Sequence, residues 1–298
     1  MSFTYKFAET LVKLSGAKKL FLLPEDKILN YARKTNAKHP FTVPTDRDFI
    51  YEVEEIDGYK NLIVKNNEEK AGSAILFLYG GGNITCPDKR DLQFVKRLAK
   101  ETKKDVWFSH YPLCIDTSIK VTYEFLYKTY ESMLKYYSKE NISFIGFSSG
   151  AVNALGVLLY NNDVGNLPIP KLIVAVSPGA VFRTEREKKM AEDLRDKDAI
   201  IAPDYLYNVE NIATKGEDIP EYMIYGPAGD FSNFPMTHFY YGTHEVIYAF
   251  AKSFTDSYDK YKAPYKMHLG EGLCHCYPLL TFFPEGKAAQ EEIIEILK

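Results

Sequence analysis

A serine between two glycines, at a point where a buried strand gives way to a helix, is the first feature of this sequence that suggests chemistry. The segment Gly146-Phe147-Ser148-Ser149-Gly150 matches the pattern G-x-S-x-G and lies between the apolar run ISFIGF and the small and aliphatic run AVNALGVLL. In such a turn, side chains at the glycine positions would collide with neighbouring backbone. The central Ser148 is then held in a strained conformation with its hydroxyl exposed above the sheet. The pattern predicts a nucleophile, with a plain serine-rich turn as the alternative.

A serine hydroxyl is a poor nucleophile without a base, so a histidine is expected beside Ser148. His275 lies in the loop GEGLCHCYP, directly after the last predicted strand. Ligands bind at the carboxyl ends of the strands in a parallel sheet, so His275 is the predicted base. The other histidines lie in a loop, within or at the end of strands, or at a helix start (His39, His110, His238, His268 and His244).

A carboxylate that orients the histidine is the third expected member, and in chain order it falls between the serine and the histidine. Glu245 lies in YYGTHEVIYAF, where a predicted strand ends and a helix is expected from residue 244. It is the predicted acid, although the helix dipole alone also favours an acidic residue at a helix start. The other carboxylates considered are Asp230, Asp256 and Asp259.

Three consecutive glycines follow another predicted strand, in FLYGGGNIT at residues 77–85. Glycines allow backbone N–H groups to approach a ligand closely, as an oxyanion hole requires. A glycine run after a strand can also bind phosphate, but the Gly-Lys-Ser/Thr of a P-loop is missing here. Together with the serine turn, this run favours acyl transfer.

The hydrophobic pattern predicts the elements that position these residues. From residue 73 onward, short apolar runs alternate with helical stretches, and the runs are SAILFLYG, DVWFSHYP, NISFIGFS, KLIVAVSPG and THFYYGT, with a last strand at 265–270 and a final helix. Strands buried on both faces in a parallel sheet have this pattern. Before them, residues 49–65 alternate apolar and polar side chains around Asp57-Gly58, which predicts an antiparallel hairpin. The predicted fold class is therefore α/β, with a mostly parallel sheet.

Several helices are expected outside and between these strands. A 3.6-residue period predicts a helix over residues 117–138, from Leu126, Tyr130, Met133, Leu134 and Tyr137. Residues 1–36 are predicted to be helical, with Phe7, Leu11 and Leu14 on one face; a cap on the core is favoured over a membrane-surface helix. The segment 180–222 interrupts the alternation, and its REKKMAEDLRDKD is expected to form a solvated helix in a lid. We expect one domain over residues 1–298, with cap elements at about 1–40 and 180–222.

Composition excludes several classes of protein. Of the 298 residues, 46% are hydrophobic and 26% are charged, as expected for a soluble globular protein with a substantial core. The net charge of −3 gives no reason to expect nucleic acid or an anionic membrane as a partner. No signal peptide and no run of about 18 apolar residues occurs, so a cytoplasmic protein without stable membrane insertion is expected, in an oligomeric state that the sequence leaves open. Four cysteines (Cys86, Cys114, Cys274 and Cys276) are too few for a disulfide scaffold and lack zinc-ligand spacing.

Taken together, these motifs resemble those of an α/β-hydrolase of the hormone-sensitive-lipase-like esterase family. YGGGN at 79–83 is similar to the HGGG motif of that family, GFSSG at 146–150 to its nucleophile elbow, GTHEVI at 242–247 to its acid-bearing segment and LCHCYP at 273–278 to its histidine loop. The resemblance extends from about residue 60 to the C-terminus. It implies an α/β-hydrolase fold with a helical cap, and ester hydrolysis without cofactor or metal. It also implies an oxyanion hole formed by the backbone amides of Gly80, Gly81, Gly82 and Ser149.

Two positions depart from the family pattern. Tyr79 stands where the family usually has histidine, and Glu245-Val246 stands where it usually has aspartate followed by proline. The sequence predicts a serine esterase for small or medium acyl esters, in which Ser148 attacks, His275 takes its proton and Glu245 orients the imidazole. An amidase, peptidase or lactonase would use the same three residues. A ligand-binding protein without catalysis is the alternative from another class.

Overall fold

The fold is built on one central sheet. The computed structural model describes residues 2–15, 17–66 and 71–298. In this part of the chain the sheet has eight strands: β1 Ile50–Ile56, β2 Tyr59–Lys65, β3 Ala74–Leu78, β4 Asp105–His110, β5 Ile142–Phe147, β6 Leu172–Val176, β7 Met236–Gly242 and β8 Tyr265–Gly270. Their spatial order is β1-β2-β4-β3-β5-β6-β7-β8. The pairs β1–β2 and β2–β4 are antiparallel, whereas all the others are parallel.

The central strands are almost wholly apolar because both faces of the sheet are covered. Every residue of β3, β5 and β6 is buried. At the edge, the β1–β2 hairpin turns through Asp57 and Gly58, whose φ angles are 50° and 82°. Positive φ at both central residues is what a tight hairpin turn of this kind requires. The predictions of a mostly parallel sheet and of an N-terminal antiparallel hairpin are both confirmed.

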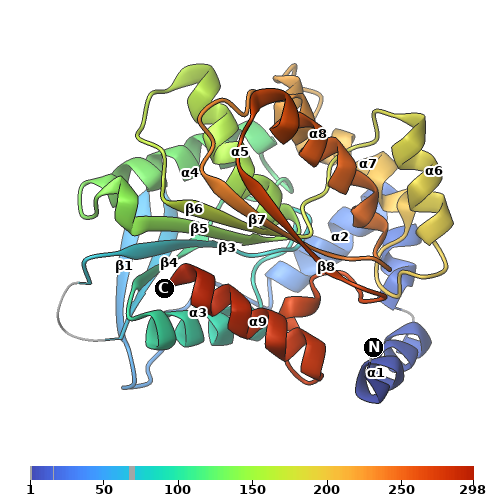
Figure 1. Cartoon of the computed structure of the whole chain (residues 1–298), viewed down its shortest axis with the longest axis horizontal. Coiled ribbons are helices and arrows are strands. Elements are labelled where there is room, and N and C mark those ends of the chain that lie inside the picture. The colour runs from blue at the N-terminus through green and yellow to red at the C-terminus, as the bar shows by residue number, and fades with distance from the viewer. Residues whose placement is uncertain (1, 16, 67–70) are drawn as a thin grey trace.

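Helices cover the two faces of the sheet. Figure 1 shows α3 and α9 on one face and α4, α5 and α8 on the other, with α1 at the edge of the molecule. The α-helices of the described residues are α1 Phe3–Ser15, α2 Glu25–Asn36, α3 Lys89–Thr102, α4 Ile119–Leu134, α5 Ser149–Val164, α6 Glu185–Leu194, α7 Pro203–Thr214, α8 Ala251–Tyr261 and α9 Pro284–Leu297. Short 3-10 helices connect them: η1 Ala17–Leu22, η2 Lys139–Asn141, η3 Glu221–Met223, η4 Gly226–Ala228, η5 Val246–Phe250 and η6 Tyr277–Leu279. Within residues 2–15, 17–66 and 71–298, no helix is both long and apolar enough to cross a membrane.

Two predicted helices have different limits in the structure. The helix expected over 117–138 ends at Leu134, and Tyr137 is buried beyond its end, where its hydroxyl donates to the Asp105 carboxylate at 2.6 Å. The helix expected from residue 244 begins only at Ala251, after η5. Glu245 is extended, with φ −108° and ψ 140°, because its side chain is held in the interior.

The charged segment 186–198 is not wholly solvated, so that prediction is wrong for one face of α6. Glu187 is fully buried and closes a capping box with Thr184. Its carboxylate also accepts hydrogen bonds from the hydroxyl groups of Tyr225, at 2.8 Å, and Ser253. A mixed-charge sequence does not reveal this burial, because the two partners lie 38 and 66 residues away along the chain.

Candidate active site

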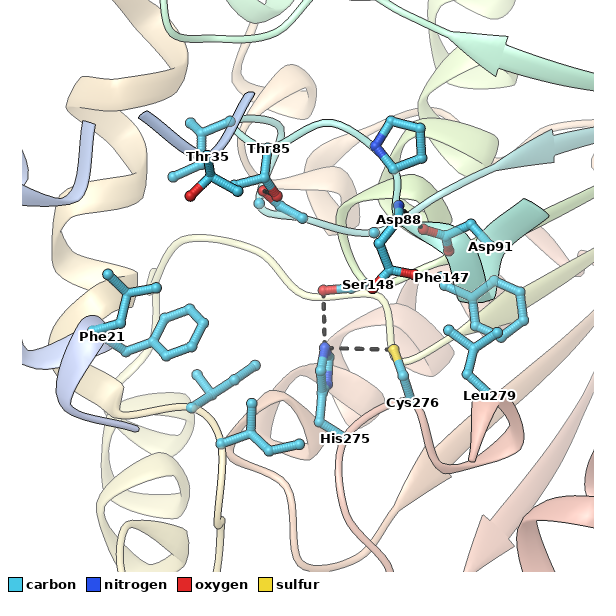
Figure 2. Close-up of a pocket in the computed structure, with 18 of the residues that line it drawn as sticks. Phe21, Thr35, Thr85, Asp88, Asp91, Phe147, Ser148, His275, Cys276 and Leu279 are labelled. Carbon is cyan, nitrogen blue, oxygen red and sulfur yellow. Dashed lines mark hydrogen bonds between the residues drawn. The ribbon is translucent and has the colours of Figure 1, made fainter. Parts of the chain in front are cut away.

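The turn at Ser148 joins β5 directly to α5. Ser148 follows the last residue of β5, and its φ of 53° and ψ of −123° lie in a sparsely populated region for a residue with a side chain. Its amide donates to the Val176 carbonyl of β6 at 2.8 Å, which holds the turn in place. Ser148 lines the central cavity, where Figure 2 shows its hydroxyl directed at His275. The predicted strand-turn-helix setting of this serine is thus present.

Close backbone packing explains the glycine at the end of this turn. A Cβ on Gly150 would lie 2.2 Å from the Leu78 carbonyl oxygen at the end of β3. The segment after β3 therefore runs directly beside the turn, and a Cβ on Gly80 would lie 3.2 Å from the Ser148 Cβ. Glycine thus brings the two segments together.

The structure brings Ser148, His275 and Glu245 together in one line of hydrogen bonds. The distance from Ser148 Oγ to His275 Nε2 is 2.9 Å, and His275 Nδ1 lies 2.5 Å from Glu245 Oε2. His275 is buried in its loop after β8, and Glu245 is fully buried. These side chains follow β5, β7 and β8, whose carboxyl ends lie at the same edge of the sheet. A base at this distance can accept the hydroxyl proton of the serine.

The second oxygen of Glu245 is fixed by two donors. Its Oε1 accepts from the Ser177 hydroxyl and from the Gly242 amide, each at 2.9 Å. Ser177 is itself buried, and its own oxygen accepts from the Cys276 amide at 3.2 Å. Ser177 was not predicted as a site residue, although it lies at the end of the predicted apolar run KLIVAVSPG. Its position directly after the predicted strand was the available signal; in the structure Ser177 follows β6 and has a φ of 53°.

The electrostatics of the histidine and its acid are coupled. Burial alone would lower the pKa of His275, but its contacts with Cys276 and Glu245 outweigh burial and hold this pKa well above its usual range. Burial raises the pKa of Glu245, and the neighbouring His275 opposes that shift. The Cys276 sulfur lies 3.5 Å from His275 Nε2, and a dashed line marks this contact in Figure 2. The pair is therefore arranged to stabilise a proton on the imidazole, as a general base requires after it has accepted one.

The glycine segment after β3 forms a tight loop at the same cavity. Gly81 and Gly82 have φ angles of 129° and 64°, which glycine adopts without strain. The Gly81 carbonyl is engaged within the loop, because it accepts from the Ile84 and Thr85 amides, each at 3.1 Å. Gly80, Gly81 and Gly82 line the cavity with Ser148. Ser149 opens α5 and is not among the described residues that line the cavity.

Three contacts anchor this loop to the rest of the fold. Asn83 and Asn153 of α5 exchange side-chain amide hydrogen bonds of 2.8 and 3.4 Å. The Tyr111 hydroxyl donates to the Tyr79 carbonyl at 2.6 Å, and the two rings stack with centroids 4.4 Å apart. Tyr79 is buried, so it packs beneath the loop. The tyrosine thus occupies the family's histidine position as a packed ring, and the roles of Asn83 and Asn153 were not predicted.

A cavity of about 530 Å³ surrounds the serine. Apolar side chains from both predicted cap segments line this cavity. The first segment contributes Leu20 and Phe21 of η1, and the second contributes Ile200 and Ile201 before α7 and Tyr205 within it. Figure 2 shows Asp88, Asp91 and Leu279 on the side of the cavity opposite Phe21. Arg90 and Leu280 also line the cavity. Burial raises the pKa of Asp91 to about 7. The cavity can therefore accept a mainly apolar ligand with a few polar groups.

The other candidate residues lie elsewhere or make other contacts. His238 Nδ1 and His268 Nε2 are 3.1 Å apart on β7 and β8, and His110 lies against the Tyr79 ring. The alternative acids do not join the line of hydrogen bonds. Asp256 is bonded to Lys252, Asp259 accepts from Tyr265, and Asp230 is exposed. His39 also lines the cavity, but within the described residues it is His275 that bridges Ser148 and Glu245 by hydrogen bonds.

No group of histidine, cysteine, aspartate or glutamate side chains among the described residues could hold a metal ion. The described cysteines carry free thiols: Cys114 and Cys274 are buried, whereas Cys86 and Cys276 are partly exposed.

Comparisons with known proteins agree with this architecture. The model of a family described as having the alpha/beta hydrolase fold matches residues 75–279. Similar solved structures include an esterase/lipase from an uncultured bacterium, with 17% sequence identity and a TM-score of 0.81. Another is EstE5 soaked with p-nitrophenyl butyrate, with 18% sequence identity and a TM-score of 0.82. An esterase from the bacterial hormone-sensitive lipase family has 17% identity and a TM-score of 0.81. Each alignment covers 100% of this chain and 98% of the other. A comparison with curated proteins gives no match.

Proposed function

We propose that this chain, which belongs to the family with the alpha/beta hydrolase fold, is a serine esterase that cleaves carboxylic esters. The observation that carries the proposal is the line of hydrogen bonds from Glu245 through His275 to Ser148, with distances of 2.5 and 2.9 Å. This line ends at a cavity that the glycine loop also borders. A nucleophile, its base and an orienting acid in this order are the requirements for acyl transfer through serine.

In the first half of the proposed reaction, Ser148 Oγ attacks the carbonyl carbon of the ester. His275 Nε2 takes the hydroxyl proton, and the Glu245 carboxylate stabilises the resulting imidazolium. The carbonyl oxygen becomes an oxyanion, which we assign to the backbone amides of Gly80, Gly81, Gly82 and Ser149. The tetrahedral intermediate then collapses, and the alcohol leaves with the proton from His275. An acyl group remains on Ser148.

The second half releases the acid. A water molecule gives a proton to His275 Nε2 and attacks the acyl carbon, which again places negative charge on the carbonyl oxygen. When the second tetrahedral intermediate collapses, the proton returns to Ser148 Oγ and the carboxylic acid departs. Ser177 and the Gly242 amide keep Glu245 oriented through both halves.

We further propose that residues 1–40 and 180–222 are cap elements of a single domain over residues 1–298. The support is that Leu20, Phe21, Ile200 and Ile201 from these segments line the cavity. A cavity of about 530 Å³ with this lining fits an ester with a small or medium acyl chain.

A panel of p-nitrophenyl esters with acyl chains of increasing length tests this function, with the p-nitroanilide of the best acyl group beside it. We expect hydrolysis of the shorter esters, slow or no cleavage of the anilide, and no turnover by the Ser148→Ala variant. Cleavage of the anilide alone would instead indicate an amidase. Tight binding of esters without turnover would indicate a ligand-binding protein.

A further inference from the structure

The outer face of α1 is an exposed apolar stripe formed by Phe3, Phe7, Leu11 and Leu14. These residues are spaced so that they share one face of the helix, and their exposed fractions are 85%, 59%, 52% and 79%. Single exposed apolar residues are ordinary on a protein surface, but four large ones along one helix face are informative. A contiguous stripe of this kind marks a surface that another phase or molecule covers.

The inner face of α1 is already used by the fold. Tyr5 is 2% exposed, and its ring meets the Phe283 ring edge-on with centroids 5.0 Å apart. Val12 lies on the same side, where it borders a small cavity with Ile200 and Cys274. The helix is therefore apolar on two opposite faces, and packing against the core explains only one of them.

Charge separates the segment that contains the stripe from the rest of the chain. Residues 2–22 carry one acidic residue, Glu9, and four lysines, which gives a net charge of +3 within a chain of net charge −3. The remaining residues therefore carry −6. The lysines are Lys6, Lys13, Lys18 and Lys19. Lys13 pairs with Glu9 at 2.9 Å and Lys18 is bonded to two backbone carbonyls, so Lys6 and Lys19, both exposed, supply the positive charge outside these contacts.

We propose that the stripe on α1 docks the protein on an anionic lipid surface. An apolar helix face buried at the headgroup boundary, with lysines near it, is how amphipathic helices bind such surfaces. A second copy of the chain would cover the stripe less well. In a two-fold contact the same surface meets itself, so the +3 segments of both copies would face each other and repel.

Docking would also place the cavity near the lipid surface. The 3-10 helix η1 continues the N-terminal segment, and its Leu20 and Phe21 line the cavity. Lys18 donates to the backbone carbonyls of Arg195 and Asp198, which ties η1 to the segment between α6 and α7. This consequence for substrate access rests on the proposed esterase function, whereas the docking itself does not.

Vesicle co-sedimentation tests the docking without any use of activity. The full chain is mixed with vesicles of phosphatidylcholine alone, or of phosphatidylcholine with about one third phosphatidylglycerol. We expect binding to the anionic vesicles to be at least tenfold tighter than to the neutral ones, and to weaken as salt is raised. No binding to the anionic vesicles, or equal binding to both, would overturn the proposal.

Substitutions locate the binding surface. Phe7→Ser combined with Leu11→Ser should reduce binding to anionic vesicles at least tenfold, with unchanged melting temperature and unchanged hydrolysis of a water-soluble ester. Val164→Ser, which removes an apolar side chain of 60% exposure at the end of α5, should bind like the wild type. Equal binding by the double variant would refute the role of the stripe. The proposal would also be refuted if the wild type were a dimer and the double variant a monomer, because the stripe would then be an interface between two copies of the chain.

Discussion

Replacing Glu245 by glutamine changes one charge at a fully buried position, and the surroundings determine how the new amide must lie. Glu245 Oε1 accepts a hydrogen bond from the Gly242 amide at 2.9 Å, and an NH₂ group cannot accept it. The glutamine carbonyl must therefore remain at that place, and its NH₂ group must face His275 Nδ1. Two donors cannot bond, so His275 would present Nδ1 as the acceptor and carry its proton on Nε2.

A histidine in that tautomer cannot take the proton of Ser148, because the Nε2 that faces Oγ at 2.9 Å is already protonated. Loss of the correct tautomer in a triad costs about 10⁴ in kcat, which corresponds to about 5 kcal/mol in the barrier. We expect Glu245→Gln to lower kcat by about this factor with little change in KM. Initial rates with a short p-nitrophenyl ester measure both constants.

The residual activity of the variant carries a second signature. In the wild type, Glu245 helps to hold the pKa of His275 well above its usual range, so kcat/KM should fall as pH drops through that raised pKa. The glutamine variant lacks this charge, and its acid limb should move to lower pH. Asp230→Asn and Asp256→Asn serve as controls, because both carboxylates lie outside the line of hydrogen bonds. A fully active Glu245→Gln protein, or an inactive control, would refute the assignment of the acid.

Three further substitutions test the surroundings of the site. Ser177→Ala removes one of the two donors to Glu245 Oε1 and should lower kcat about 10- to 100-fold without unfolding; unchanged kinetics would contradict its positioning role. Tyr79→Phe should alter kcat less than about threefold, since the ring packs on Tyr111, whereas a loss on the order of 10²-fold would show that the hydroxyl takes part. Asp91→Asn removes a carboxyl whose pKa burial raises to about 7. The folded wild type keeps the Asp91 proton to higher pH than the unfolded chain does. Its free energy of unfolding, measured with urea, should therefore fall by about 2 to 3 kcal/mol between about pH 5 and pH 8. An equal fall in the Asp91→Asn variant would contradict the raised pKa of Asp91.

The sheet and the nucleophile turn were predictable because their signals are local. Continuous apolar runs such as ISFIGF require cover on both faces, and the glycines around Ser148 reflect close backbone packing with β3. The placement of His275 followed from the rule that ligands bind at the carboxyl ends of parallel strands.

The contacts that position the site were not predictable in the same way. Asn83 and Asn153 pair across 70 residues of chain, and Ser177 meets Glu245 across 68. Periodicity within a segment carries no information on such pairs. The same limit explains the misplaced helix start at residue 244, where an acidic residue usually favours a helix N-terminus. In the fold, the Glu245 side chain instead lies in the interior, where it is hydrogen-bonded to His275, 30 residues further along the chain.

The central claim is that Ser148 is the nucleophile, and labelling with a fluorophosphonate tests it most directly. Intact-mass measurement followed by peptide mapping should find one phosphonyl adduct, on Ser148. Ser149→Ala should be labelled like the wild type, because only the backbone amide of Ser149 is assigned a role, whereas Ser148→Ala should remain unlabelled. An adduct on another residue, or labelling of the Ser148→Ala protein at the wild-type rate, would contradict the account.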